Sequence, residues 1–207
     1  MKVFDPTTGG FVIRPASGYV AGRLSRMDLD QGFWWSPSNQ ILNGVSGTAR
    51  AVTFAVNSTQ TEANRLNAKE VATVVQKNGF RLWGNRTCGI DPLWAFLPVR
   101  RTADMIYESL EQALLWAMDR PFSEQLLPDI RDSVQAYLDT LQARGATLGG
   151  NCWIDPDLNT EATLKAGQFY LNFDIEPPAP MERLSFRAYR NGDYYEELIA
   201  AVNSNAA

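Results

Sequence analysis

The chain has 207 residues, of which 45% are apolar and 11% aromatic, and this suits one large domain or two small ones with a substantial core. It contains no histidine, which excludes Ser-His-Asp and Cys-His mechanisms and histidine-based metal sites. The net charge of −4 argues against a nucleic-acid surface, and no apolar run approaches the roughly 18 residues that a membrane span needs.

The N-terminal part is predicted to form two extended pieces and a helix. Residues 1–4 are strand-like, and a turn with a short extended piece follows over 9–16. Apolar residues at near-helical spacing then predict a helix over about 16–27. Gly18 and Gly22 lie four apart on this helix, so we expect its glycine side to pack tightly against a neighbouring element.

An aromatic loop follows this helix. The three consecutive aromatic residues at 33–35 precede several turn residues, which indicates an ordered loop rather than a flexible linker. Residues 49–56 are then expected to form a strand, and 61–66 a helical turn.

The stretch GFRLWGNRTC, residues 79–88, combines a tryptophan, two arginines, an asparagine and a cysteine. The segment 71–76 before it is strand-like, and Asn78 with Gly79 gives a hairpin signal, so 80–84 is expected to return as a second strand. A ligand site, a redox site and a rigid structural turn all remain open on these residues alone. The cysteines at 88 and 152 lie in no CxxC motif, and no secretory leader is visible, so a reduced pair is favoured over a disulfide.

Two long amphipathic helices are predicted in the middle of the chain. The first covers 101–119 and ends before Pro121. The second runs from near Ser123 to Arg144, and Gly145 is a natural C-terminal cap. The apolar stripe of the first helix is Ile106, Leu110, Ala113, Leu114 and Ala117. The stripe of the second is Leu126, Ile130, Val134, Leu138 and Leu141.

The last third is predicted to be rich in β-structure. Residues 151–154 suit a short strand and 159–165 a short helix, while 168–175 alternates apolar and polar side chains. The segment 183–190 repeats this alternation, so we expect it to pair with 168–175 as an antiparallel hairpin with one solvent-exposed face. Residues 194–202 suit either a helical turn or a free strand. The predicted fold class is α+β, a mixed or antiparallel β-sheet covered by two long helices, with additional short helices.

Carboxylates are the only abundant catalytic candidates. Asp28 and Asp30 would suit a glycosidase pair, but such a pair is expected by chance among 23 acidic residues. Turn formation and helix capping explain Asp155 and Asp157 better than a divalent cation does, because the EF-hand spacing is absent. No Gly-rich phosphate loop is present. We therefore expect no enzyme activity, no catalytic residue, no metal and no cofactor.

Ordered blocks of the sequence resemble contractile-tail sheath proteins of temperate phages. The blocks are PASGYVAGRLSRMD, QGFWWSPSN, GVSGTAR, GFRLWGNRTC, PLWAFLPVRRTADMI, RGATLGGNCW and FYLNFDIEPPAP. The resemblance covers about residues 3–198 and corresponds to the C-terminal half of the family's usual length. It implies a fragment in which 1–192 is a C-terminal sheath core domain and 193–207 a C-terminal arm.

The resemblance implies a structural protein. Sheath proteins of this family polymerise around a tail tube and contract to drive the tube through the host cell envelope during genome delivery. The implied partners are other copies of the chain, the tail tube protein, and baseplate and tail terminator proteins, with no direct nucleic-acid contact and no membrane insertion. The implied location is the tail of a virion, after assembly in the bacterial host cytoplasm. The sheath of a phage-derived R-type bacteriocin is an alternative within the same class.

Within this resemblance, residues 79–88 form a structural hairpin rather than a ligand site. Its glycines allow the turns, its polar side chains can bond backbone groups of the exit loop, and Cys88 is expected to be a small buried residue. The residues of this hairpin motif are Gly79, Trp83, Gly84, Asn85, Arg86 and Thr87.

The resemblance also implies two contact surfaces. One is the polar face of the second long helix, a candidate contact with the tube or another subunit. Its residues are Glu124, Arg131, Asp132 and Asp139. The other is the C-terminal arm, which subunits of such sheaths exchange. Its candidate residues are Tyr194, Tyr195, Leu198 and Ile199.

Two hypotheses from other classes stay open. The chain would be a carboxylate-based cell-wall hydrolase if Asp28 or Asp30 were catalytic. It would be a binding module if Phe33, Trp34 and Trp35 formed an aromatic platform for sugars or nucleotides.

Overall fold

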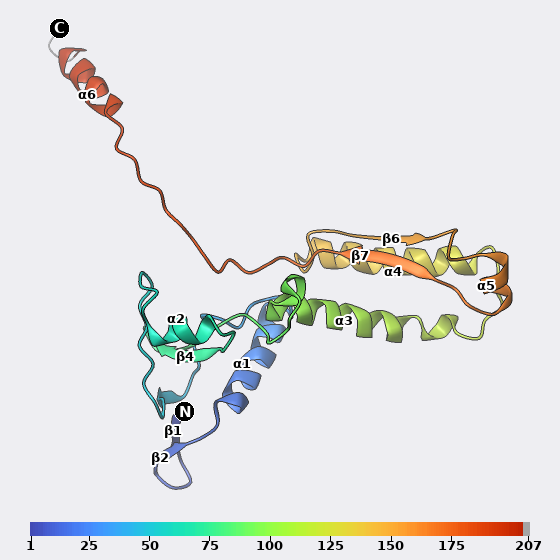
Figure 1. Cartoon of the computed structure of the whole chain (residues 1–207), viewed down its shortest axis with the longest axis horizontal. Helices are drawn as coiled ribbons and strands as arrows, with labels where there is room; N and C mark the ends of the chain where they lie inside the picture. The colour runs from blue at the N-terminus through green and yellow to red at the C-terminus, as the bar shows by residue number, and fades with distance from the viewer. Residues whose placement is uncertain (205–207) are drawn as a thin grey trace.

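The computed structural model describes residues 1–204 and shows a body with a long C-terminal arm (Figure 1). One part of the body contains the N-terminal strands and the first two helices. The other part is a rod in which long helices and two strands lie side by side. The arm, here residues 176–204, leaves the body where these two parts meet and carries a helix at its end.

The N-terminal strands are β1 (Lys2–Asp5), β2 (Gly10–Ile13) and β3 (Val45–Gly47). They form an antiparallel sheet in the order β2-β1-β3. Val3 pairs with Val12, and this side of the sheet packs with Met1 and Leu42 in a small core. The expected extended pieces at 1–4 and 9–16 are therefore confirmed.

Helix α1 (Ala16–Asp30) confirms the predicted helix and extends beyond it. It begins directly after Pro15 and is anchored by the buried side chain of Met27. The expected tight packing of its glycines is wrong, because no atom lies within 4 Å of the place where a Cβ of Gly18 or Gly22 would be. This side of the helix is open to solvent.

The strand expected over 49–56 is also wrong, and these residues form an irregular segment. Their backbone bonds the start of the next helix instead of a sheet, since Thr53 accepts a hydrogen bond from the Ala63 amide at 3.1 Å. Helix α2 (Glu62–Asn67) confirms the helical turn, and the Thr61 side chain caps it.

The predicted hairpin is confirmed as β4 (Thr73–Gln76) and β5 (Phe80–Trp83). Asn78 and Gly79 both have positive φ angles, of 49° and 101°, which close the tight turn between the strands. After β5, the short helix η1 (Pro92–Trp94) leads into the rod.

The two long helices of the rod are α3 (Leu97–Ala113) and α4 (Leu126–Ala143). Helix α3 begins earlier than predicted because Pro98 occupies its first turn, where a missing N–H is tolerated. A short helix, η2 (Leu115–Ala117), follows it. The entire predicted stripe of α4 is buried. The stripe of α3 is buried only at Ile106 and Leu110.

A two-stranded antiparallel sheet packs on α4. Its strands are β6 (Gly150–Ile154) and β7 (Leu171–Ile175), and the short helix α5 (Glu161–Lys165) lies between them in the chain. Cys152 on β6 and Phe173 on β7 are partners, and both face the core that the two long helices share. Phe173 also contacts the ring of Tyr107 on α3, edge to face, with 6.1 Å between the ring centroids.

The expected pairing of 183–190 with 168–175 is wrong. The partner of β7 is β6, and residues 181–190 form an extended, exposed segment without a strand. Proline residues in EPPAP, at 176–180, lack the N–H that a reversing hairpin would use, so the chain runs on instead of folding back.

The chain ends in helix α6 (Asp193–Ser204), which decides between the two alternatives for 194–202 in favour of a helix. Residues 205–207 of the predicted arm lie outside the described residues. The α+β class is confirmed, although the strands form separate small antiparallel sheets rather than one sheet under two helices. The division into a core at 1–192 and an arm at 193–207 stays a prediction.

Candidate functional site

The loop that leaves β5 is bonded to the segment at the start of α3. The Leu97 amide donates to the Asn85 carbonyl at 2.7 Å, and the Thr87 amide donates to the Ala95 carbonyl at the same distance. The Thr87 hydroxyl donates to that carbonyl as well. Ser36 of the aromatic loop hydrogen-bonds the Asn85 side chain. These bonds join the hairpin motif to the base of the rod.

Gly84 occupies a position that only glycine can fill. Its φ angle is +137°, and an added Cβ would lie 2.7 Å from the Cα of Ala72. A side chain there would therefore clash with backbone atoms. It would also have to adopt a backbone conformation that is unfavourable for residues other than glycine.

We expect Gly84→Ala to lower the free energy of unfolding by at least about 1–3 kcal/mol because of this strain and crowding. Gly22→Ala provides the matched control, since open space surrounds Gly22 in the middle of α1. That substitution should raise stability by roughly 0.5–1 kcal/mol. Urea unfolding followed by circular dichroism measures both, and equal effects of the two substitutions would contradict the interpretation.

Arg86 joins the hairpin motif to the base of the C-terminal arm. Its guanidinium donates to both carboxylate oxygens of Glu182, with N···O distances of 3.3, 3.2 and 2.9 Å. The guanidinium also lies over the ring of Phe96, 4.7 Å from its centroid. The hydrogen bonds to Glu182 raise the pKa of Arg86 above its ordinary value. The two partners are 96 residues apart in the chain.

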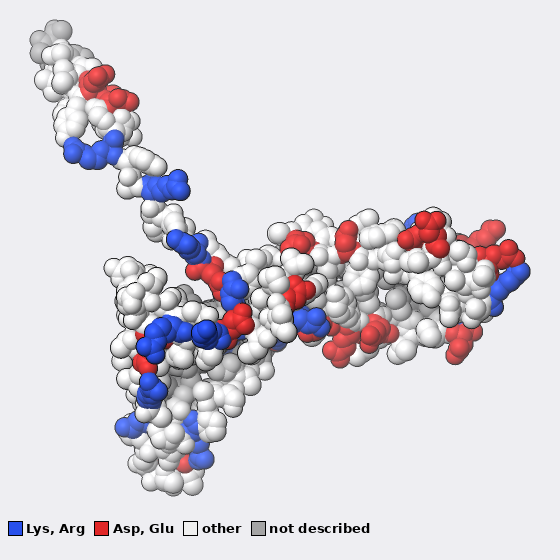
Figure 2. Space-filling model, in the orientation of Figure 1, with Lys and Arg blue, Asp and Glu red and all other residues white. Residues whose placement is uncertain are grey.

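Beyond Glu182 the arm exposes large apolar side chains. Phe186 is 86% exposed and Tyr189 is 84% exposed. Figure 2 shows basic side chains along the same segment, between the body and the terminal helix. They belong to Arg183, Arg187 and Arg190. The arm is thus a basic, partly apolar extended segment that stands away from the body.

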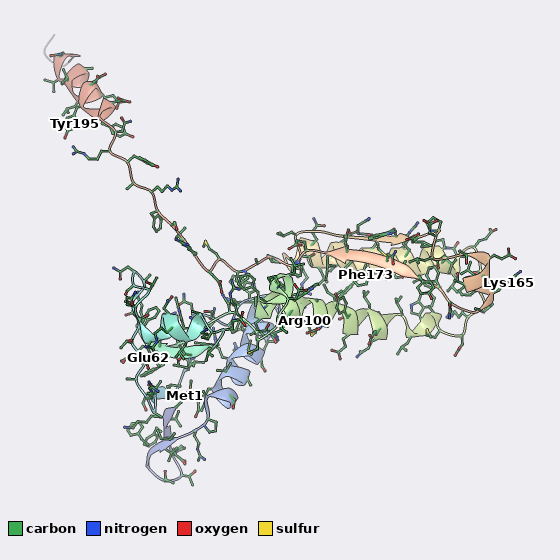
Figure 3. The ribbon with its side chains drawn as sticks, viewed as in Figure 1. Met1, Glu62, Arg100, Lys165, Phe173 and Tyr195 are labelled. Atoms are coloured by element: carbon green, nitrogen blue, oxygen red, sulfur yellow. The ribbon has the colours of Figure 1, made fainter. Side chains whose placement is uncertain are left out.

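The four residues predicted for arm exchange lie on α6, and all are exposed. Tyr195 lies at the end of the arm, far from Phe173 on the sheet of the same chain (Figure 3). Segment 183–190, rather than these residues, is extended and lies beside no other strand (Figure 1). Arm exchange through Tyr194, Tyr195, Leu198 and Ile199 stays a prediction.

The residues predicted for the tube contact are also exposed, but they do not all lie on one helix. Glu124 precedes α4, while Arg131, Asp132 and Asp139 lie on it. Arg131 pairs with its neighbour Asp132 at 2.7 Å, and the Asp139 carboxylate accepts a hydrogen bond from the side-chain Nε2 of Gln135 at 2.8 Å. These contacts lie on the solvated surface of the rod, where red acidic side chains are visible in Figure 2.

The carboxylates considered for catalysis are bound by arginines. Asp28 forms a two-point ion pair with Arg101, at 3.1 and 2.6 Å, and this links α1 to α3. Asp30 pairs with Arg26 of its own helix at 2.8 Å. These separate pairs give the two carboxylates structural roles rather than a shared site.

The remaining candidates also have structural partners. Phe33 and Trp34 pack against the rod core, and only Trp35 of the three aromatic residues is largely exposed. Asp155 accepts a hydrogen bond from the Asp157 amide at 2.9 Å, as expected for a turn. Within residues 1–204, no acidic or cysteine cluster has the arrangement of a metal site, and no helix is long and apolar enough to cross a membrane.

The two cysteines are free thiols, in agreement with the expectation of a reduced pair. The expected burial of Cys88 is wrong, because the chain turns outward at the surface after the bonds of Thr87 to Ala95. Cys152 is buried on β6, and burial raises the pKa of its thiol.

Comparison with known proteins links these features to one family. Residues 2–88 match the model of the phage tail sheath protein central domain, and residues 90–190 match the phage tail sheath C-terminal domain. The chain is 34% identical over 202 residues to the tail sheath protein of Escherichia phage P2, covering 98% of this chain and 51% of that protein. It is 36% identical over 199 residues to the tail sheath protein of Burkholderia phage BcepMu, covering 94% and 42%.

Solved structures have the same fold. The helical sheath of the anti-feeding prophage in its contracted state superposes with a TM-score of 0.79 at 24% identity, over 92% of this chain and 54% of that one. The sheath of an extracellular contractile injection system in its contracted state gives 0.77 at 21% identity, over 90% and 54%. The chain spans about half the length of the curated relatives it matches. The two adjacent family matches cover nearly all of it, and the chain belongs to the phage tail sheath protein family.

Proposed function

We propose that the chain is a structural subunit of a contractile tail sheath, which polymerises around a tail tube and contracts to drive the tube through a host cell envelope. Membership of the tail sheath family supports this function. The observation that carries the proposal is the exposed arm, because a segment with Phe186 and Tyr189 in water gains stability when another subunit covers it.

The arm of one copy would pair with the sheet of another copy. In an extended conformation, Leu184 and Phe186 lie on one side of segment 183–190, and Arg183 and Arg187 on the other. The sheet of β6 and β7 has two strands. The Gln135 side chain of α4 already bonds the Gly150 carbonyl and the Cys152 amide of β6, which leaves the edge of β7 for another strand. Adding the arm there would extend the apolar layer on α4 and bring arginines toward the exposed Asp174.

The partners in such a sheath are other copies of the chain, the tail tube protein, and baseplate and tail terminator proteins. The exposed acidic and basic side chains of α4 support a charged contact with the tube or a neighbouring subunit. The proposed location is a virion tail assembled in the bacterial cytoplasm. The same subunit would serve a headless R-type bacteriocin equally well.

Immunogold electron microscopy of particles from an induced culture tests the proposal. Antibody raised against this chain should label contractile tails along their outside, and labelling should disappear when the antibody is first absorbed with the purified chain. Capsids on labelled particles would distinguish a phage from a bacteriocin. Unlabelled tails, with an antibody that recognises the native protein, would refute the sheath function.

A further inference from the structure

The base of the C-terminal arm is held at two successive places. The first is the end of β7, where the Leu148 amide donates to the Glu176 carbonyl at 2.7 Å and the Glu176 amide donates to Gly149 at 3.2 Å. Pro177 is buried directly after it. The second place is Glu182, which Arg86 binds through three N···O contacts. The side chains of residues 183–203 are exposed.

Arg86 is itself held by rigid elements. Its backbone forms a β-bridge with Phe96, its guanidinium lies over the Phe96 ring, and its neighbours Asn85 and Thr87 bond the start of the rod. The planar guanidinium therefore reaches the arm in a fixed orientation, and a two-point contact with a carboxylate restrains direction as well as distance. A lysine would supply the charge without this directional restraint.

The arm has a competing place to bind within its own subunit. Segment 183–190 alternates like a strand, and the open edge of β7 ends only seven residues before Glu182, at Ile175. Folding back onto that edge would need a reversal between β7 and residue 183. The prolines at 177, 178 and 180 disfavour it, and the contact at Glu182 holds the last residue before the strand-like segment.

We propose that the Arg86–Glu182 pair is a clasp that sets the direction in which the arm leaves the body, and so keeps segment 183–190 off the sheet of its own subunit. Arg86 is in this sense a positioning residue. The clasp gives the hairpin motif a role that its local hydrogen bonds do not explain. The use of the freed arm by another copy rests on the proposed function, whereas the direction of the arm in a single chain does not.

Distances between two spin labels test the clasp in the purified 207-residue chain. The labels occupy cysteines introduced at Glu108 on α3 and at Ala188 in the arm, both exposed positions. Cys88 is replaced by serine, and the buried Cys152 stays. The chain with an intact clasp should give mainly a long-distance population, beside a minor shorter-distance one. Glu182→Gln, which removes the charge on the arm alone, should increase the shorter-distance population about fivefold, as expected for an exposed ion pair.

Three further measurements separate positioning from a general structural role. Arg86→Gln alone should increase the shorter-distance population as Glu182→Gln does. The charge swap, Arg86→Glu combined with Glu182→Arg, should restore the long distance. Salt at about 1 M should act on the intact clasp as Glu182→Gln does, because it screens exposed pairs. Asp104→Asn, which breaks the exposed Arg100–Asp104 pair on α3, should leave the distances unchanged.

Unchanged distances in Glu182→Gln and in high salt would overturn the clasp. A loss of the long distance in the charge-swapped chain as well would also overturn it, because the residues would then act by some other means than their attraction. Polymerisation is measured separately on the full-length protein. Failure of the unsubstituted protein to form sheaths would count against the proposed function, while the distances in the single chain would still decide the clasp.

Discussion

Replacing Leu138 by alanine should lower the free energy of unfolding of this chain by about 2–5 kcal/mol. Leu138 is completely buried on α4, in the cluster that joins both long helices to the sheet of β6 and β7. Removing its branched end leaves a cavity there, and the neighbours cannot collapse fully into it because each belongs to a different element. A loss of this size is a large fraction of the total stability of an ordinary domain.

Leu148→Ala is the matched control for this variant. Leu148 is also a leucine of the rod, but its side chain is 66% exposed, and its backbone amide keeps its bond to Glu176 in either variant. Its replacement should change stability by less than about 0.5 kcal/mol. Urea unfolding of both variants, followed by circular dichroism and tryptophan fluorescence, gives the comparison. Similar midpoints for the two would mean that the rod core does not hold the chain together.

The rod could be predicted from the sequence because its signals are local. The stripe from Leu126 to Leu141 repeats at helical spacing over several turns, and all of its members are buried. Asn78 with Gly79 specifies a tight turn through backbone conformations that few other residues adopt. In both cases one short stretch contains the residues that determine the structure, so no knowledge of distant partners is needed.

Strand pairing could not be predicted in the same way. Segments 168–175 and 183–190 alternate alike, and alternation shows that a segment can pair without showing which segment it pairs with. The intervening prolines carried the missing information, since they oppose the reversal that a hairpin would need. The prediction of a strand over 49–56 is wrong for a related reason, because the backbone of this segment bonds the start of α2 and has no strand beside it.

The candidate site was partly visible in the sequence. The hairpin motif contains Arg86, but the sequence does not indicate Glu182 as its partner, because a pair of residues 96 apart has no local signature. The only sequence signal for a distant partner is that Arg86 has no acidic residue near it at helical or cross-strand spacing. The exposure of Cys88 does not follow from the sequence either, because the resemblance of a motif does not show which of its side chains face the solvent.

Phe186→Ala should reduce polymerisation of the full-length protein about 10- to 100-fold without changing the stability of the isolated chain. The side chain is 86% exposed in the single chain, so its removal costs little there. In the proposed strand exchange it lies on the apolar side of the arm and becomes buried against the helices of another copy. Burying a phenylalanine contributes roughly 1.5–3 kcal/mol, which corresponds to about that change in affinity.

Tyr189→Ala distinguishes strand exchange in a defined register from nonspecific hydrophobic association of the arm. Tyr189 is an aromatic residue of the same segment and is 84% exposed, but the alternation places it on the opposite side from Phe186. Its replacement should leave polymerisation nearly unchanged, as measured by sedimentation and electron microscopy. Equal losses for both variants would contradict a defined strand register.

Deletion of 193–207 asks whether α6 is needed in addition to the strand. We expect it to abolish polymerisation while the body stays folded, because α6 carries the exposed apolar residues Tyr194, Tyr195, Leu198 and Ile199 at the end of the arm. Normal sheaths from the truncated protein, together with the loss in Phe186→Ala, would assign the exchange to segment 183–190 alone. Normal sheaths from both would refute arm exchange, since Phe186 is the largest side chain on the apolar side of the strand and α6 carries the exposed apolar residues beyond it.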